Sequence, residues 1–480
     1  MEKLTLYPWQ AEDVKRIVAE LPTVGGALLP WALGSGKTVA SLEILRGLDA
    51  KRALIIAPLS THDSWVATAK RQGLPEVRIA NRKNKAGRAA LADLEMGWDG
   101  WYVVGPTFMT RSDVSMWGVD AIIADEVHQY VEKTSKGLKN LLKIESTYRI
   151  ALSGTPARNK VENLWGVNRF LYPTRTLPSD IADPKFYRWA ESRLTMKEIY
   201  TSQKDQFGAP KKVKQFEGER VPGSIFRQMP LVIPHYARER CCDAHPQGVL
   251  ADLHEAVEVH ETIDLLPDQK RAIKDMETML VTQIGESMMV ADIPLVAQQR
   301  IRQCILGVPT VEWTEKNGEE VQTVSFADDC KSPFIDRLIE ILNDDDEPFV
   351  VWTPSAKFAR VVVRRLNKAG ITADEYSGSR KADIGRFGKD FRVLVAIPSA
   401  AGTGTDGLQR VSNSEVWLDR DLDETTNEQA VGRLFRTGQT GQVRRWIFHD
   451  SDGRSEGRYS DAVMKRLALN ASLRKEAGLE

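Results

Sequence analysis

The chain has 480 residues, of which 28% are charged and 42% are apolar, and its 66 basic residues balance 66 acidic ones. This length exceeds what one hydrophobic core ordinarily supports, so we expect at least two domains. No apolar run approaches the roughly 20 residues of a membrane span, and the N-terminus lacks a secretory signal pattern, which together predict a cytoplasmic protein without a membrane partner. A net charge of zero argues against a uniformly basic nucleic-acid-binding protein, so any such contact must be local.

Short apolar runs that are typical of strands alternate with helical stretches in the first part of the chain. They are 53–58 (ALIIAP), 101–105 (WYVVG), 119–124 (VDAIIA) and 148–154 (YRIALSG). The pattern returns late in the chain, at 349–353 (FVVWT), 391–397 (FRVLVAI) and 414–419 (SEVWLD). This alternation predicts an α/β fold with two parallel sheets and a cleft between them.

The middle of the chain, from 173 to 329, lacks this alternation. It contains a predicted helix at 268–285 and a loop at 316–320 (KNGEE), so it is interpreted as an insertion that is part helix and part loop. Two lysine-rich stretches, 70–88 and 204–214, are candidate nucleic-acid contacts. A solvated charged surface explains them equally well.

A glycine-rich loop follows an apolar run within 29–45 (LPWALGSGKTVASLEIL) and leads into a predicted amphipathic helix. Glycines let backbone N–H groups close around phosphate oxygens, Lys37 can reach the outer phosphates, and the Thr38 hydroxyl can bind Mg²⁺. Trp31 stands where this pattern usually has its first glycine, so the loop is a variant. A turn with an incidental lysine is disfavoured because a strand precedes the loop and a helix follows it. The predicted phosphate-binding residues are Gly34, Ser35, Gly36, Lys37 and Thr38.

Two adjacent acids, Asp125 and Glu126, follow the predicted strand 119–124. Asp125 is expected to hold Mg²⁺ through its water shell, and Glu126 to orient and deprotonate the attacking water. Alone, the pair is a weak indication, because a solvated strand end has the same composition. Together with the upstream loop it predicts a site that hydrolyses ATP with Mg²⁺.

DEVH at 125–128, with LGSGKT, resembles the DEAH-type signature of superfamily-two helicases and translocases. The stretch 151–173 (ALSGTPARNKVENLWGVNRFLYP) is similar to one in Swi/Snf-type DNA translocases, and 6–10 (LYPWQ) and 58–65 (PLSTHDSW) resemble two further motifs of that family. The resemblance implies two RecA-like parallel-sheet lobes with a partly helical insertion between them.

The same resemblance implies how the chain is divided. Lobe 1, with the ATP-binding motifs, would span 1–173, the insertion or linker 174–329, and lobe 2 330–480. The stretch 332–342 (SPFIDRLIEIL) resembles the helix that opens the family's second lobe.

In the last third, 427–443 (NEQAVGRLFRTGQTGQV) resembles the family's QAxGRxxRxGQ, and 400–419 resembles the preceding glycine-rich motif. The resemblance implies that Arg433 and Arg436 enter the ATP site as arginine fingers, although a surface helix held by salt bridges is the alternative. It assigns nucleotide binding to Gln10, as the adenine contact, and to Gln429. Coupling of the γ-phosphate to nucleic acid is implied for His128, Ser153, Thr155, Gly402 and Gly404. Strand-end capping by the hydroxyls and a surface location of the histidine are the alternatives.

Cys241 and Cys242 lie near His235 and His245 in the sequence. Adjacent cysteines seldom supply both ligands of a tetrahedral zinc site, and no paired CxxC completes one. Two partly buried thiols are the favoured interpretation.

The resemblance implies an ATP-dependent translocase or helicase of a compact bacterial or phage type that acts on double-stranded DNA, with protein partners through the insertion. An RNA helicase is an alternative, but it would not be expected to carry GTPARNKVENLW and GRLFRTGQ. An ATP-gated nucleic-acid-binding subunit of a larger assembly is another. A fused nuclease is disfavoured, because no further cluster of acids with a lysine stands outside the lobes.

Overall fold

The computed structural model describes residues 4–31, 34–154, 156–157, 160–173, 183–204, 210–233, 255–316, 319–402, 405, 407–436 and 438–455. By its internal contacts the chain divides into two compact units, Met1–Ala251 with Lys465–Glu480, and Asp252–Met464. Within the described ranges, no helix is both long and apolar enough to cross a membrane.

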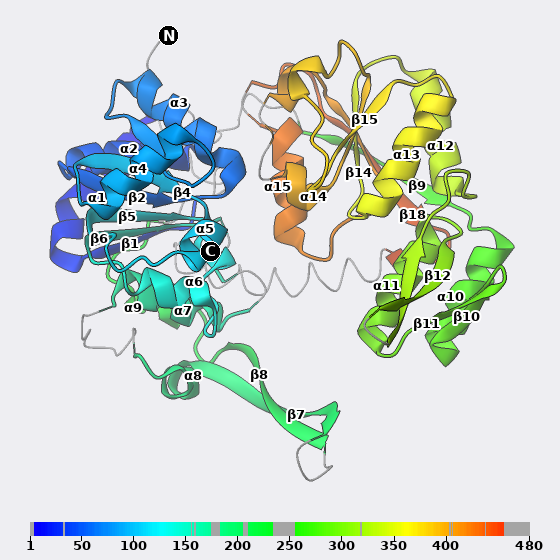
Figure 1. Ribbon diagram of the computed structural model, residues 1–480, viewed down its shortest axis with the longest axis horizontal. Helices are drawn as coiled ribbons and strands as arrows, with labels where there is room; N and C mark the ends of the chain where they lie inside the picture. Colours follow the sequence, from blue (N-terminus) through cyan, green and yellow to red (C-terminus); the bar gives the residue numbers. More distant parts are fainter. Residues whose placement is uncertain are drawn as a thin grey trace. The chain divides into compact units, whose positions relative to one another are not determined.

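The first unit is built on a six-stranded parallel sheet with the order β1-β6-β5-β2-β4-β3 (Figure 1). Its strands are β1 (Gly26–Leu29), β2 (Arg52–Ile56), β3 (Val77–Ile79), β4 (Gly100–Val104), β5 (Val119–Asp125) and β6 (Ser146–Leu152). All four strands predicted in this part of the sequence are present. Because the strands are parallel, their carboxyl ends meet at one edge of the sheet, where ligands of α/β folds bind.

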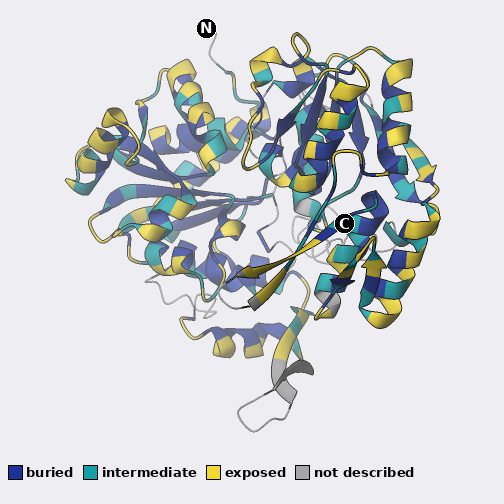
Figure 2. Ribbon diagram, turned by 45° about the vertical axis from the view of Figure 1, so that its right-hand side comes forward, coloured by how far each residue is buried: buried dark blue, intermediate teal, exposed yellow. Residues whose placement is uncertain are grey.

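Helices cover both faces of this sheet and bury one apolar core on each. Leu54 and Ile56 of β2 belong to one core and Ala53 and Ile55 to the other, as the alternation of side chains along a strand requires. The helices are α1 (Pro8–Val24), α2 (Lys37–Gly47), α3 (His62–Gln72), α4 (Lys85–Glu95), α5 (Pro106–Arg111), α6 (Lys136–Leu141) and α7 (Asn163–Leu171). Figure 2 shows the strands as buried and the outer sides of the helices as exposed.

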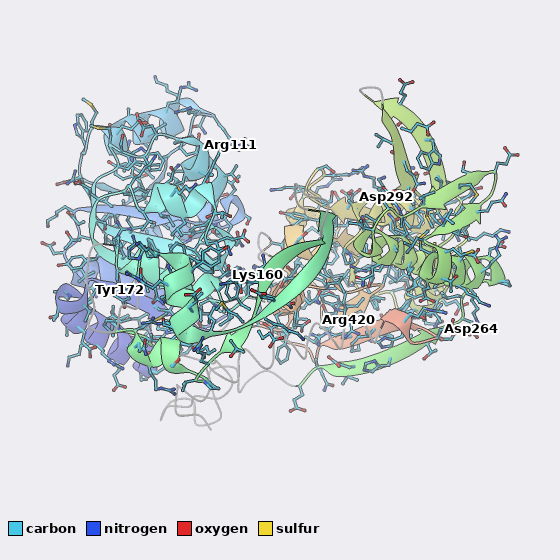
Figure 3. The ribbon with its side chains drawn as sticks, turned by 90° about the horizontal axis from the view of Figure 1, so that it is seen from below. Arg111, Lys160, Tyr172, Asp264, Asp292 and Arg420 are labelled. Atoms are coloured by element: carbon cyan, nitrogen blue, oxygen red, sulfur yellow. The ribbon has the colours of Figure 1, made fainter. Side chains whose placement is uncertain are left out.

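After α7 the chain leaves the sheet and later returns to it. Residues 183–233, here called the arm, contain α8 (Phe186–Arg193), the antiparallel strands β7 (Leu194–Lys204) and β8 (Pro210–Glu219), and α9 (Ser224–Gln228). The arm ends beside β1, where the Leu28 N–H donates to the Leu231 carbonyl at 3.0 Å and the Ile233 N–H donates to the Leu28 carbonyl at 3.0 Å. Before the arm begins, Tyr172, which follows α7 and is labelled in Figure 3, donates from its hydroxyl to the Gly26 carbonyl of β1 at 3.1 Å.

The second unit contains a six-stranded parallel sheet with the order β15-β16-β14-β17-β18-β9. Its strands are β9 (Val257–Ile263), β14 (Phe349–Trp352), β15 (Ala373–Tyr376), β16 (Val393–Ala396), β17 (Ser414–Trp417) and β18 (Arg444–Asp450). The three late strands predicted from the sequence are present. The prediction of an α/β fold with two RecA-like parallel-sheet lobes is therefore confirmed.

Four helices of the second unit follow strands of its sheet or precede them: α12 (Pro333–Asp344), α13 (Ala356–Lys368), α14 (Pro398–Ala401) and α15 (Glu424–Leu434). The helix predicted at 332–342 corresponds to α12, and its N-terminus is capped by Ser332, whose side chain accepts from the Ile335 N–H. Apolar cores again lie on both faces of the sheet.

The segment 174–329, interpreted from the sequence as one insertion, is shared between the units, because the division falls at residues 251 and 252. Its later part supplies β9 to the second sheet, together with α10 (Pro267–Met279), β10 (Val281–Ile284), β11 (Ser287–Val290), α11 (Pro294–Leu306), β12 (Thr310–Lys316) and β13 (Glu319–Ser325). The helix predicted at 268–285 is shorter in the structure, where α10 ends at Met279. Leu280 adopts a left-handed conformation with φ of 59°, which ends α10, and the residues after it pair with β11.

Candidate nucleotide site

Three neighbouring strands bring the predicted site residues of the first unit to one edge of its sheet. β1 leads to the glycine-rich loop, β5 ends at Asp125, and β6 ends one residue before Ser153. β6 lies between β1 and β5 in the sheet. Segments that are far apart in the sequence therefore converge on one place, as the parallel arrangement predicts.

The glycine-rich loop has a backbone shape that depends on glycine. Gly34 and Gly36 have φ of 78° and 75°, the left-handed region that other residues rarely adopt. A Cβ on Gly36 would also lie 2.5 Å from the side-chain amide nitrogen of Gln10. That amide donates to the Ser35 carbonyl at 2.7 Å, while the Gln10 side-chain oxygen accepts from the Tyr7 N–H at 2.9 Å. Gln10 is thus brought to the loop, next to the N-terminus of α2, where anions bind favourably.

Lys37 is the first residue of α2, and its ammonium group interacts electrostatically with the two acids at the end of β5. Its Nζ donates to the Trp31 carbonyl at 2.9 Å. Burial lowers the pKa of Lys37, and the charges of Glu126 and Asp125 oppose this shift. Thr38 follows on the first turn of the same helix.

Asp125 is buried, with 8% of its surface exposed. Burial raises the pKa of Asp125 from 3.8 to about 7, the charge of Glu126 adds to this shift, and Lys37 opposes it. A buried carboxylate next to a second acid is costly unless a cation approaches it. These side chains therefore fit Mg²⁺ at Asp125, where the cation would neutralise the carboxylates. They also fit phosphate at the loop, where the anion would neutralise Lys37.

Glu126 has a left-handed backbone with φ of 49°, which costs a residue other than glycine about 1 kcal/mol. Its N–H donates to the Asp125 side-chain oxygen Oδ1 at 3.0 Å. The next residues form a short 3₁₀ turn (Val127–Gln129). After the turn, the Tyr130 hydroxyl donates to the Asp125 carbonyl at 2.7 Å.

His128 connects the acids to the end of β6. Its Nδ1 lies 2.7 Å from the Ser153 hydroxyl oxygen and 3.4 Å from a carboxylate oxygen of Glu126. His128 is buried, so the alternative of a surface histidine is wrong. Of the residues assigned to coupling in this lobe, Thr155 lies outside the described residues.

In the second unit, Arg433 of α15 contacts the glycine-rich motif that precedes it. Its Nε and Nη2 donate to the Gly402 carbonyl at 2.8 and 2.6 Å, and its Nη1 donates to the Thr405 carbonyl at 2.7 Å. Gln429 is buried one turn before Arg433 in α15. Gly402 lies so close to it that a Cβ added to Gly402 would be 3.3 Å from the Gln429 Cβ and 2.4 Å from the Pro398 carbonyl oxygen. Gly402, Gln429 and Arg433 are thus brought together, and Arg436 follows shortly after α15.

The remaining sequence predictions fall outside this geometry. Gly404 and the segment with Cys241, Cys242, His235 and His245 lie outside the described residues. The other two cysteines, Cys304 and Cys330, are buried free thiols, and burial raises the pKa of each. Within the described ranges, no three His, Cys, Asp or Glu side chains form a group that could hold a metal ion.

Two features of the site were not predicted from the sequence. The Trp31 indole N–H donates to the Ile233 carbonyl at 2.7 Å, which joins the glycine-rich loop to the end of the arm. Tyr130 supports the backbone of Asp125. The replacement of a glycine by Trp31 was the only sequence signal for either feature.

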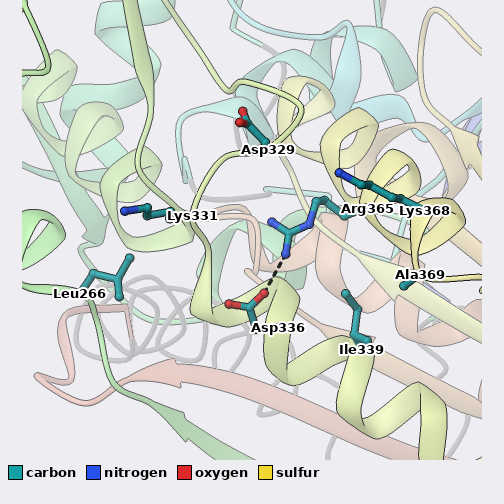
Figure 4. A pocket seen from close by; sticks show the side chains of 8 residues that line it. All are labelled: Leu266, Asp329, Lys331, Asp336, Ile339, Arg365, Lys368 and Ala369. Carbon is teal, nitrogen blue, oxygen red and sulfur yellow. Dashed lines mark hydrogen bonds and ion pairs between the residues drawn. The ribbon is translucent and has the colours of Figure 1, made fainter.

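A separate pocket of about 560 Å³ in the second unit contains none of the predicted site residues (Figure 4). Asp336 and Ile339 of α12 line it on one side, and Arg365 and Lys368 of α13 on the other. Arg365 and Asp336 form an ion pair at 2.8 Å. The charges that line this pocket are mixed in sign.

The first unit is thus a parallel α/β fold with a glycine-rich loop, a lysine and two acids near one edge of its sheet, an arrangement that fits a nucleotide. Residues 9–200 match the family model of the SNF2-related domain. The chain is 22% identical to Protein CHROMATIN REMODELING 24 of Arabidopsis thaliana, in an alignment that covers 91% of the chain and 44% of that protein. It is also 22% identical to DNA excision repair protein ERCC-6-like of Mus musculus, over 87% of the chain and 38% of that protein.

Among solved structures, the Sulfolobus solfataricus SWI2/SNF2 ATPase core in complex with dsDNA aligns with 16% identity and a TM-score of 0.41, over 98% of this chain and 97% of that chain. The chain spans less than half the length of the two curated relatives named above. Residues 9–200 are thus similar to the SNF2-related domain, and most of the chain is similar to these two proteins, whose names refer to chromatin remodelling and DNA excision repair.

Proposed function

We propose that this chain is a Mg²⁺-dependent ATPase that couples ATP hydrolysis to movement along double-stranded DNA. The observation that carries the proposal is that Lys37, Asp125 and Glu126 interact at one edge of the sheet. They lie next to a loop in which two glycines adopt the left-handed backbone conformation. The match of residues 9–200 to the SNF2-related domain supports the same activity.

In the proposed reaction, the loop N–H groups and Lys37 bind the phosphates, and Glu126 accepts a proton from the attacking water. Thr38 and Asp125 would hold Mg²⁺, which when bound neutralises charge on the phosphate oxygens. His128 contacts both Glu126 and Ser153, so it orients the Glu126 carboxylate and links it to the end of β6. Gln10 would contact the adenine, because its amide already lies against the loop.

The second unit is proposed to complete the site with Arg433 and Arg436, and with Gln429 as a further nucleotide contact. The spacing of NEQAVGRLFRTGQ supports this assignment. Gly402, Gly404 and Thr155 are proposed to couple the nucleotide to the nucleic acid. The contact of Arg433 with the Gly402 carbonyl gives this coupling a physical route within the second unit.

Double-stranded DNA is the proposed track, held through its phosphates and hence without sequence preference. The DEAH-type subgroup, the compact bacterial or phage type, strand separation as a helicase, the cytoplasmic setting and protein partners through 174–329 stay predictions from the sequence. The division into 1–173, 174–329 and 330–480 is likewise a proposal for the functional segments.

The test is the rate of ATP turnover with duplex DNA, single-stranded DNA or RNA, with Lys37→Ala as the inactive control. We expect duplex DNA to stimulate turnover most and Lys37→Ala to abolish it. Stimulation by RNA alone would favour an RNA helicase. Tight ATP binding without turnover by the wild-type chain would favour an ATP-gated binding subunit.

A further inference from the structure

The arm, residues 183–233, contacts the nucleotide site on the side of the glycine-rich loop. Its last residues pair with β1 through the hydrogen bonds between Leu28 and residues 231 and 233. The Trp31 indole adds a hydrogen bond of 2.7 Å to the Ile233 carbonyl. The Trp31 carbonyl also accepts a hydrogen bond from Lys37, so Trp31 connects the end of the arm to the lysine of the glycine-rich loop.

The arm also contacts the segment that follows DEVH, through Lys133. The Lys133 Nζ lies 4.2 Å from the ring centre of Phe186, 5.5 Å from that of Tyr187 and 5.4 Å from that of Phe216. Phe186 and Tyr187 come from α8 and Phe216 from β8, and the rings of Phe186 and Phe216 pack edge to face with centres 5.5 Å apart. A cation over the faces of aromatic rings is attracted to them, and more strongly where water is displaced.

The segment between DEVH and Lys133 is tightly packed. Gly166 of α7 lies so close to it that a Cβ would be 1.8 Å from the Val131 carbonyl oxygen. Lys160, labelled in Figure 3, pairs with Glu132 at 3.0 Å, although both side chains are more than half exposed and the pair contributes little. Tyr130, at the start of the segment, donates to the Asp125 carbonyl. Between Lys133 and the acids, the chain is therefore held at Val131 by the close approach of Gly166 and at Tyr130 by the hydrogen bond to the Asp125 carbonyl.

We propose that Lys133 is a positioning residue for ATP hydrolysis. Its ammonium group, held by the three rings of the arm, fixes the segment after Glu126 and so sets the alignment of the Glu126 carboxylate. Lys133 touches neither nucleotide nor metal in this account. The inference rests on the proposed ATPase function and adds that the arm controls the rate of the chemical step.

The experiment compares steady-state ATP turnover of the full chain carrying Lys133→Ala, Lys133→Arg or Lys136→Ala. Lys136 is an exposed lysine on the first turn of α6 and serves as the matched control. We expect Lys133→Ala to lower kcat about fivefold, as the loss of a partly desolvated cation–π contact implies, with KM for ATP within about twofold. Lys133→Arg restores kcat, because a guanidinium binds the same rings. A kcat of Lys133→Ala equal to that of Lys136→Ala overturns the proposal, and so does an equal loss in Lys133→Arg.

A second pair of variants guards against a simple folding defect. Phe216→Leu removes one of the three rings of the same contact, so it should lower kcat by a smaller factor than Lys133→Ala. The double variant should be no slower than Lys133→Ala alone, because the ring has no effect once the lysine is absent. Losses that multiply in the double variant contradict the proposal. Absence of ATP turnover by the wild-type chain would instead contradict the proposed function, which separates the two failures.

Discussion

Asp125 should destabilise the nucleotide-free protein at neutral pH, so Asp125→Asn is expected to stabilise it. Burial, with the neighbouring charge of Glu126, raises the pKa of Asp125 from 3.8 to about 7. A shift of about three units at about 1.4 kcal/mol each sets an upper limit of about 4 kcal/mol. An asparagine in the same place still loses hydration, so about 2 kcal/mol is a reasonable expectation. For a unit of this size that corresponds to a rise of about 4–8 °C in the unfolding midpoint.

The pH dependence gives the sign of the effect. Below about pH 4 Asp125 is protonated in both the folded and the unfolded states, and its burial carries no ionisation cost. As the pH rises from about 4 to 7, the unfolded state ionises more readily than the folded one, and stability is lost progressively. Above pH 7 the loss is complete. The gain from Asp125→Asn should therefore be larger at pH 8 than at pH 5.

The assay is thermal unfolding of both proteins at pH 5 and pH 8 without nucleotide, with ATP turnover measured in parallel. Turnover should be lost in Asp125→Asn although the variant is more stable. Asp113→Asn is the control, because hydrogen bonds from Ser115 lower the pKa of this exposed acid and its replacement should bring no gain at pH 8. An Asp125→Asn protein that is less stable than wild type at pH 8, or equally shifted at both pH values, would refute the reasoning.

Three further predictions concern packing and coupling. Gly166→Ala places a Cβ 1.8 Å from a backbone carbonyl oxygen and should lower the free energy of unfolding, measured by urea titration, by about 3 kcal/mol. Gly118→Ala is the control and should change little, because a Cβ there has nothing within 4 Å. Equal stabilities of the two variants would contradict the prediction. Ser153→Ala removes the hydrogen bond to His128 and should lower kcat about tenfold while KM for ATP stays unchanged. A raised KM with an unchanged kcat would contradict the coupling role of Ser153. Arg433→Ala leaves the Gly402 and Thr405 carbonyls without this donor and should lower the free energy of unfolding, measured by calorimetry, by about 1–3 kcal/mol. ATP turnover should also be lost. An unaltered unfolding transition would contradict the stabilising role of Arg433.

Much of the fold could be predicted because its signals are local. The strands at 53–58, 119–124 and 349–353 are apolar runs of the length and composition that parallel sheets require. Lys37 could be assigned for the same reason, because a glycine-rich loop between a strand and a helix leaves its whole signature within a few residues.

What could not be predicted depends on contacts between distant residues. β9 joins the second sheet by pairing with β18, far along the chain, and its own sequence contains Glu258, His260 and Glu261, which suit an exposed edge rather than a buried strand. The left-handed Leu280 ends a helix without the usual glycine. The rings of Phe186 and Phe216 around Lys133 likewise leave no local pattern, because each is an ordinary apolar residue of its own element.

The central claim is that ATP hydrolysis at Glu126 drives movement along duplex DNA. The most direct measurement is displacement of a third strand from a DNA triplex on a long duplex, by the wild-type chain and by Glu126→Gln. The account predicts ATP-dependent displacement by the wild type, and ATP binding without displacement by Glu126→Gln, because the variant keeps Lys37 and the loop but lacks the group that accepts the proton. Equal displacement by both proteins would contradict it.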